Sequence, residues 1–96
     1  MINSKQRSKL RSMAHHLKPT VIIGKAGIID GSISSINQAL DAHELIKVKL
    51  SSDKEVKKQF LDIIESSLSA FLIGNIGHTY IIFRQQKDPD KVRIKI

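Results

Sequence analysis

The sequence predicts a small α/β (α+β) domain in which helices pack on a four-stranded mixed sheet, in two layers. Segments with the 3.6-residue apolar period of a helix alternate along the chain with short apolar segments rich in β-branched residues. Only Gly77-His78 and a threonine separate the last two apolar segments, as in a β-hairpin. The 96 residues suffice for one domain but not for two. We therefore expect a single domain over residues 1–96, with the order α-β-α-β-α-β-β.

The first predicted helix covers residues 4–17. Its apolar side chains recur at i, i+3, i+4 and i+7, and Pro19 follows its end. Asn3 or Ser4 can serve as its N-cap. The basic side chains of Lys5, Lys9 and Arg11 lie mostly off the apolar stripe, so we expect them to face solvent. A short buried strand over residues 20–23 comes next.

The second predicted helix begins near Asp30 or Ser32, either of which suits an N-cap. The strand that follows, residues 45–50, alternates apolar and basic side chains. Because successive side chains of a strand point to opposite faces, Lys47 and Lys49 are predicted to share one solvent-exposed face. Right-handed strand-helix-strand connections make neighbouring strands parallel in this part of the chain.

The second half of the chain predicts a third helix and the hairpin. Asp53 can cap the helix, and its apolar stripe runs to residue 68. Residues 71–76 form the third strand, which Gly74 weakens, and residues 80–83 form the fourth. The tail over about residues 85–96 is charged, and its alternating apolar residues predict at most weak pairing.

Positive charge is concentrated at the two ends of the chain. The net charge is +7: residues 1–29 contain six Lys or Arg and no carboxylate, residues 30–83 carry −2, and residues 84–96 carry +3. A charge excess that served solubility alone would not need this segregation. The pattern favours a polyanionic partner, and RNA is the partner that we predict.

Composition excludes several classes of protein. No cysteine is present, so disulfides and cysteine-based zinc sites are excluded. No apolar segment approaches the roughly 18 residues of a membrane span, and the N-terminus lacks the apolar part of a signal peptide. We therefore expect a soluble, cytoplasmic monomer without a membrane partner. The four aromatic residues are few for a protein that stacks successive bases.

The segment Gly24-Lys25-Ala26-Gly27 lies between the first strand and the second helix. Backbone amides in such a glycine loop, with the positive end of a helix behind them, can hold a phosphate. A tight turn that needs glycine only for a positive φ is the alternative. Because the surrounding sequence lacks carboxylates, we predict phosphate binding here, with Lys25 as a mobile charge at the tip.

The remaining candidate RNA-binding residues are basic side chains. Those of the first helix and the segment after it are Lys5, Arg7, Lys9, Arg11 and Lys18, for which a solubilising surface is the alternative. A second set of possible RNA-binding residues is Lys47, Lys49, His78 and Arg84. For Lys47 and Lys49, an exposed sheet face without RNA contact is equally compatible with the sequence.

Residues 17–19, 21–28 and 43–49 together resemble the CRM domain, in particular its single-domain bacterial YhbY-type members. The resemblance implies the fold of the C-terminal domain of translation initiation factor 3 and a GxxG loop reminiscent of KH domains. It also implies RNA binding without catalysis, and association with precursors of the large ribosomal subunit. Gly24, Gly27 and Lys25 match the family's motif, whereas His78 stands where we would expect a lysine.

Other kinds of site have weaker support in the sequence. Adjacent His15 and His16 would point about 100° apart on a helix, and no cysteine or paired carboxylate completes a metal site. No cofactor, metal or catalytic residue is predicted, since the glycine loop is not a Walker A sequence. Two alternatives to RNA binding remain: docking of the strand at Lys47-Val48-Lys49 on an acidic protein, and an enzyme with a small anionic substrate at the glycine loop.

Overall fold

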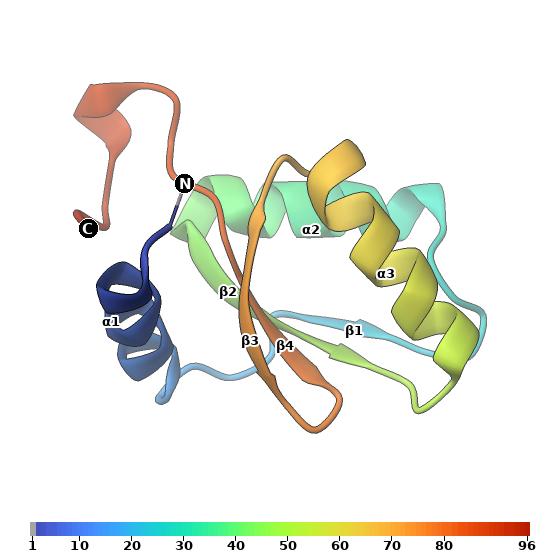
Figure 1. Cartoon of the computed structure of the whole chain (residues 1–96). Helices are drawn as coiled ribbons and strands as arrows, with labels where there is room; N and C mark the ends of the chain where they lie inside the picture. Colours follow the sequence, from blue (N-terminus) through green and yellow to red (C-terminus); the bar gives the residue numbers. More distant parts are fainter. Residues whose placement is uncertain (1) are drawn as a thin grey trace.

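The computed structural model describes residues 2–96, which form three helices and a four-stranded sheet (Figure 1). The elements are α1 (Ser4–Ala14), β1 (Val21–Ile23), α2 (Asp30–His43), β2 (Leu45–Leu50), α3 (Lys54–Ser66), β3 (Phe71–Ile76) and β4 (Thr79–Phe83), followed by a short 3₁₀ helix, Pro89–Lys91. The predicted order and the mixed α/β class are confirmed. In the part of the chain that the structure describes, no helix is long and apolar enough to cross a membrane.

The strands lie in the order β1-β2-β4-β3. β1 pairs with β2 in parallel, as predicted for neighbouring strands joined by a helix. β4 returns through the hairpin and lies between β2 and β3, antiparallel to both. The hairpin strand therefore occupies the centre of the sheet, and β1 and β3 are its edges.

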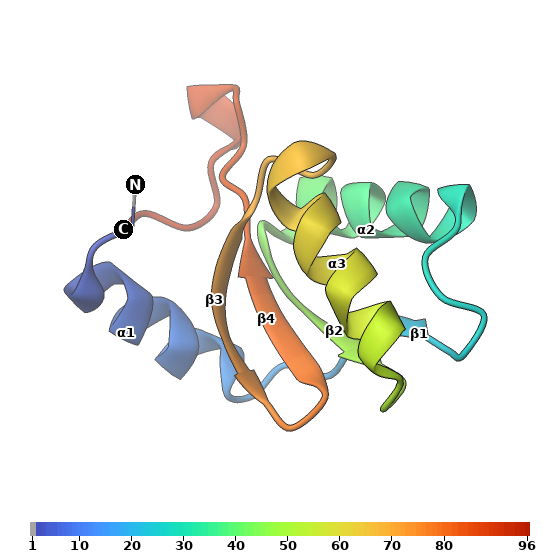
Figure 2. The ribbon, with the colours of Figure 1, turned by 45° about the vertical axis from the view of Figure 1, so that its right-hand side comes forward.

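Helices cover both faces of this sheet. On one face, α2 and α3 pack on β2 and β4, with Phe60 and Ile82 fully buried between them. On the opposite face, α1 buries Leu10 against Phe83 and Ile81. Figure 2 shows β3 and β4 between α1 on one side and α2 and α3 on the other. The expected two-layer packing is therefore wrong, because both faces of the central strands carry apolar side chains and each must be covered.

Side-chain caps fix the starts of the helices. Asn3 accepts a hydrogen bond from the Gln6 amide at 2.8 Å, and the Gln6 side chain accepts one from the Asn3 amide at 3.0 Å. Asp53 caps α3, as predicted, by accepting from the Glu55 amide at 2.8 Å. The N-cap position of α2 is Ile29 rather than Asp30 or Ser32. α1 ends at Ala14, earlier than predicted.

A β-bulge interrupts β3 at the residue that the sequence singled out. The register shifts between Leu72 and Gly74, so Ile73 is an extra residue in the strand. A Cβ atom at Gly74 would lie 3.3 Å from the Arg11 Nε. Glycine at this position therefore leaves room for the Arg11 guanidinium, which donates to the Ile73 carbonyl at 3.3 Å.

A buried carboxylate holds the tail against the rest of the domain. Glu44 is 0% exposed and accepts hydrogen bonds from the amides of Gln86, Arg93 and Ile94, each at 2.7 Å. Ile94 also packs beside the α1 cluster. The tail is therefore more closely attached than the weak pairing that the sequence predicts.

Candidate nucleic-acid interface

Three connecting segments lie together at the end of the sheet where β1 and β2 finish (Figure 1). The Ser51 amide donates to the Ile23 carbonyl at 2.9 Å, which holds the β2–α3 connection beside the GxxG loop, residues 24–27. The Leu50 amide donates to the His78 carbonyl at 2.9 Å, which holds the β3–β4 turn on the other side. The candidate phosphate loop and His78 therefore flank the same short segment.

The GxxG loop is a tight turn with an exposed tip. The Gly27 amide donates to the Gly24 carbonyl at 3.1 Å and closes the turn. Lys25 and Ala26 are exposed at the tip, and among residues 2–96 their amides donate to no other group. Successive backbone amides in a turn can together bind an anion, and here two of them are unpaired.

The two glycines of the loop differ in what the fold requires of them. Gly27 is buried with φ +84°, and a Cβ atom there would lie 2.7 Å from the Gln59 Oε1, which accepts from the Ile28 amide. Position 27 therefore needs glycine for its positive φ, as the tight-turn alternative predicts. Gly24 is exposed, its φ is not positive, and nothing lies within 4 Å of a Cβ built on it. The fold therefore does not require glycine at position 24.

The start of α2 contributes less positive potential than its position suggests. Asp30 occupies the first turn, where its carboxylate offsets the partial positive charge of the helix N-terminus. The attraction of this end of the molecule for an anion therefore comes mainly from the amides at the loop tip and from lysine side chains.

Two arginines of α1 hold this helix on the sheet. Arg7 is half-buried and donates to the carbonyls of Leu72 and Ile73, and Arg11 also donates to Ile73. The bulge in β3 presents these carbonyls to α1. Arg7, one of the predicted RNA-binding residues, therefore lies against β3, since the apolar packing of α1 brings it there.

The lysines of the same region remain at the surface. Lys5, Lys9 and Lys18 are exposed, and Lys9 Nζ also donates to the Lys95 carbonyl at 2.9 Å. Within residues 2–20, the exposed cations are thus these three lysines and the outer part of Arg11.

Lys47 is buried, at 7% exposure, although the strand pattern predicts an exposed side chain. Its Nζ donates to the carbonyls of Leu17 at 3.0 Å and His15 at 3.5 Å, just past the end of α1. A lysine there complements the negative end of the helix. Lys49 stays exposed because α1 does not extend over it. With Lys47 and Val48 buried, the strand that could dock on an acidic protein offers almost no exposed surface at these two positions.

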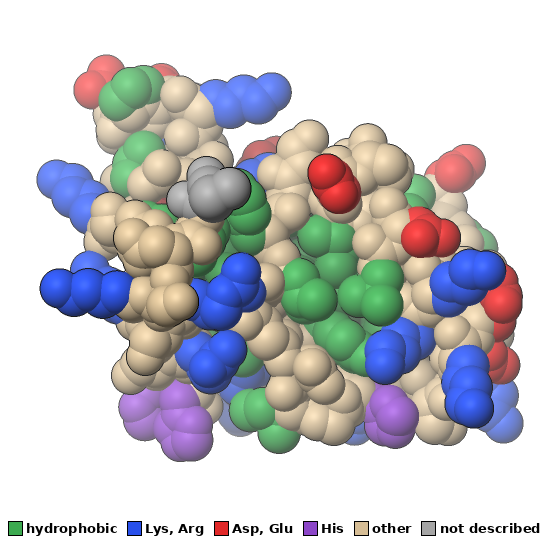
Figure 3. All heavy atoms as spheres, in the orientation of Figure 1, with side chains coloured by type: hydrophobic (Ala, Val, Ile, Leu, Met, Phe, Trp, Pro, Cys, Tyr) green, Lys and Arg blue, Asp and Glu red, His purple; other side chains and the backbone are tan. Residues whose placement is uncertain are grey.

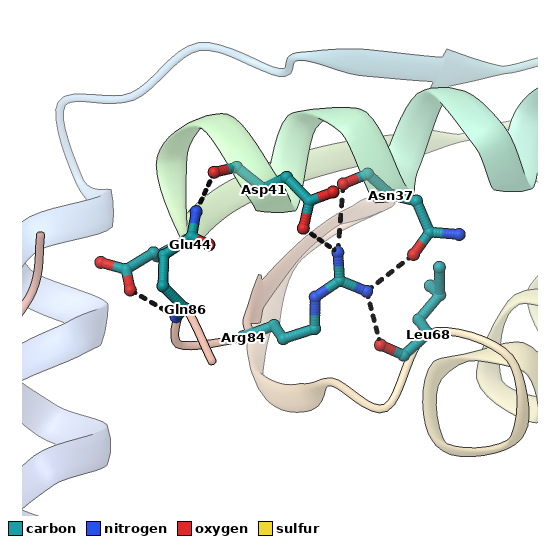
Figure 4. A network of polar contacts seen from close by, with 6 residues as sticks. All are labelled: Asn37, Asp41, Glu44, Leu68, Arg84 and Gln86. Atoms are coloured by element: carbon teal, nitrogen blue, oxygen red, sulfur yellow. Dashed lines mark hydrogen bonds and ion pairs between the residues drawn. The ribbon is translucent and has the colours of Figure 1, made fainter. Parts of the chain in front are cut away.

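The Arg84 side chain also makes structural contacts within the domain (Figure 4). Its guanidinium donates to the Asn37 side chain at 2.7 Å and to the Leu68 carbonyl at 2.8 Å, and it forms an ion pair with Asp41 at 3.0 Å. These contacts join β4 to α2 and to the end of α3. We therefore leave Lys47 and Arg84 out of the candidate interface.

The sequence matches the family model of the CRS1/YhbY (CRM) domain over residues 2–84. The chain belongs to the CRM domain family. This CRM domain is 35% identical over 88 residues to a Haemophilus influenzae protein named "RNA-binding protein", covering 91% of this chain and 89% of the relative. It is 35% identical over 95 residues to the Bacillus subtilis "Probable RNA-binding protein YqeI", covering 98% and 99%. The solution structure of the Staphylococcus aureus protein SAV1595 is 31% identical, with a TM-score of 0.77 and coverage of 99% and 100%.

Two lysines of the CRM domain that were not among the predicted site residues also belong to this end of the molecule. Lys54 and Lys57 line a pocket of about 300 Å³ together with His78 and Asn75. Their i, i+3 spacing at the start of a predicted helix is the signal that could have identified them. Figure 3 shows Lys and Arg side chains over α1 and again around the beginning of α3, where acidic side chains lie among them.

The histidines are not arranged as metal ligands. The rings of His15 and His16 meet edge to face, with centroids 5.2 Å apart. Within residues 2–96, no group of three His, Cys, Asp or Glu side chains is placed to hold a metal ion.

Proposed function

We propose that this CRM domain binds RNA and that the GxxG loop holds the RNA backbone. The observation that carries the proposal is the tip of the loop: Gly24 is open to solvent without being required by the fold, and it adjoins two unpaired amides. A residue without a side chain at this point allows a phosphate to approach the backbone closely. Membership of the CRM family and the names of the two bacterial relatives support RNA as the ligand.

In the proposed mechanism, backbone amides and lysine side chains make different contacts with the RNA. The amides of Lys25 and Ala26 hold one phosphate, and the Lys25 side chain neutralises a neighbouring one. Exposed cations at Lys5, Lys9 and Lys18 raise the rate of encounter and add salt-dependent affinity. These contacts position the RNA but read no sequence.

We further propose that the domain is a non-enzymatic monomer that acts in the cytoplasm in assembly of the large ribosomal subunit, with ribosomal RNA in pre-50S particles as its partner. Family membership supports this role. Sedimentation of tagged protein in a sucrose gradient tests it: we expect co-migration with precursors of the large subunit, lost after nuclease treatment. A partner that survives removal of RNA would instead indicate protein docking.

A titration with fragments of large-subunit ribosomal RNA tests the loop. Gly24→Asp places a carboxylate at the tip, and we expect affinity to fall at least about tenfold, which corresponds to about 1.4 kcal/mol. Ser69→Asp is the matched control: it adds the same charge at the opposite end of the sheet, where φ is +50° and aspartate is tolerated. Gly27 is left unchanged because the fold requires it. A folded Gly24→Asp variant with wild-type affinity would remove the loop from the mechanism.

The contribution of the exposed lysines is measured by the salt dependence of the same titration. Replacing Lys5, Lys9 and Lys18 with glutamine leaves Arg7 and Arg11 to hold α1 in place. If all three lysines contact phosphates, the slope of log K against log salt decreases by about 2, at roughly 0.7 per phosphate of a single strand. Binding that does not respond to salt would contradict the electrostatic part of the proposal.

A further inference from the structure

One end of the face that α1 covers carries no helix. Four residues form a row across this end, because Ile22 pairs with Lys49, Lys49 with Thr79, and Thr79 with Ile76. Paired residues of neighbouring strands point to the same face. On β2, the row is at Lys49, two residues after Lys47 and on the same face. The segment that follows α1 contacts the sheet at Lys47, before this row is reached. We call these four residues the open row.

The open row exposes apolar surface at both of its ends. Ile22 is 72% exposed and Ile76 is 63% exposed, whereas the next apolar side chains on the same face, Ile81 and Phe83, are 1% exposed. Single exposed apolar residues are common on protein surfaces. Two on one uncovered sheet face, with Lys49 and Thr79 between them, form a surface that can contact a ligand.

The charge around the open row selects the kind of ligand. None of the four strands and no residue of α1 is an aspartate or glutamate. Lys49 lies within the row. The Arg11 guanidinium lies over Gly74, in the pair of residues next to the row on the same face. A second copy of this chain would bring the same positive charges to the contact and be repelled. An RNA strand combines apolar base faces with negative phosphates.

The open row is also continuous with the GxxG loop. Ile22 precedes Gly24 by two residues, so at strand spacing the two are about 7 Å apart. A strand of RNA whose phosphate is held at the loop therefore brings its neighbouring bases to the row. The four strands span about 14 Å, and sheets of four strands in other RNA-binding folds accommodate about two or three bases.

We propose that the open row is the surface on which unpaired bases of the bound RNA lie, an inference that rests on the proposed RNA binding. Ile22 and Ile76 contact the faces of the bases. The Thr79 hydroxyl can donate to or accept from a base edge, and Lys49 neutralises an adjoining phosphate. The domain should accordingly prefer single-stranded to fully paired RNA, since paired bases cannot lie on the sheet.

An oligouridine and the same oligonucleotide with three central abasic residues test this inference, because they carry equal numbers of phosphates. We expect the wild-type domain to bind the oligouridine about tenfold more tightly than the abasic strand, from the apolar area that the bases cover. The double variant Ile22→Ser/Ile76→Ser should lose most of this preference. Leu61→Ser, which changes a 39% exposed apolar residue on α3, should bind them as the wild type does.

The outcomes separate this inference from the proposed function. Gly24→Asp should weaken binding of both strands to a similar extent, which tests the loop alone. If the double variant, checked for folding by circular dichroism, keeps the wild-type preference for oligouridine, the open row is not the base site. Equal wild-type binding of both strands also overturns the inference while leaving the loop mechanism intact. A concentration-dependent dimer that Ile76→Ser abolishes, without any preference between the strands, would assign the row to self-association instead.

Discussion

Replacing Lys47 with methionine separates a structural cation from the cations proposed to contact RNA. The Lys47 amine donates at 3.0 Å to the Leu17 carbonyl, and its second contact, at 3.5 Å, is at the limit of a hydrogen bond. We therefore count one bond. A hydrogen bond with a charged partner contributes about 1.5–3 kcal/mol, and methionine keeps most of the buried volume. The expected loss in the free energy of unfolding is about 2 kcal/mol.

Lys49 is the matched control, because it lies in the same strand and on the same face but is exposed. Urea unfolding should show that Lys49→Met changes stability by less than about 0.5 kcal/mol. In titrations with single-stranded RNA across a salt series, Lys49→Met should reduce the slope by about 0.7, whereas Lys47→Met should leave it unchanged.

The opposite pattern would refute this assignment. If Lys47→Met unfolds at the wild-type urea concentration and reduces the salt slope, its amine contacts RNA and its burial against the end of α1 does not persist in solution. If both variants reduce the slope equally, the distinction between the two lysines fails.

Three further predictions concern residues whose structural roles emerged from the fold. Glu44→Ala should lower the free energy of unfolding by about 3 kcal/mol, because three amides lose their acceptor; urea unfolding measures the loss, and hydrogen exchange at residues 86, 93 and 94 should accelerate. Gly27→Ala should cost at least about 1 kcal/mol because of its positive φ, while Gly24→Ala should be neutral in the same assay. Gly74→Val should displace Arg11 and cost about 1–3 kcal/mol through overpacking, and unchanged protection of the α1 amides would contradict this.

Local signals in the sequence predicted the elements and the position of the GxxG loop. The apolar stripes predicted the three helices, Asp53 predicted the start of α3, and Gly77-His78 predicted the hairpin turn. These features depend on residues close together in the chain, so their physical causes can be read along it. The sequence predicted that Gly74 weakens β3, and β3 is interrupted next to this residue. Only the structure showed that the interruption is a bulge beside Arg11.

The sequence did not predict which basic side chains make structural hydrogen bonds inside the domain. Arg7, Lys47 and Arg84 each bond to carbonyls far away in the sequence, and no local pattern identifies those partners. One signal for the position of α1 was present: Tyr80 to Phe83 is a continuous apolar run, which is typical of a strand covered on both faces. That run favours a sheet between two helical layers over the two layers that we expected.

The division of labour that we propose between charge and base contact has a consequence for salt dependence. The lysines and the loop amides act on phosphates, so raising salt should weaken binding of the oligouridine and of the abasic strand alike. Ile22 and Ile76 act on base faces, and apolar contact releases no counterions. The ratio of the two dissociation constants should therefore stay constant between about 50 and 200 mM salt while each constant rises steeply. A ratio that falls toward one as salt increases would mean that Lys49 and Arg11, rather than the isoleucines, distinguish the two strands.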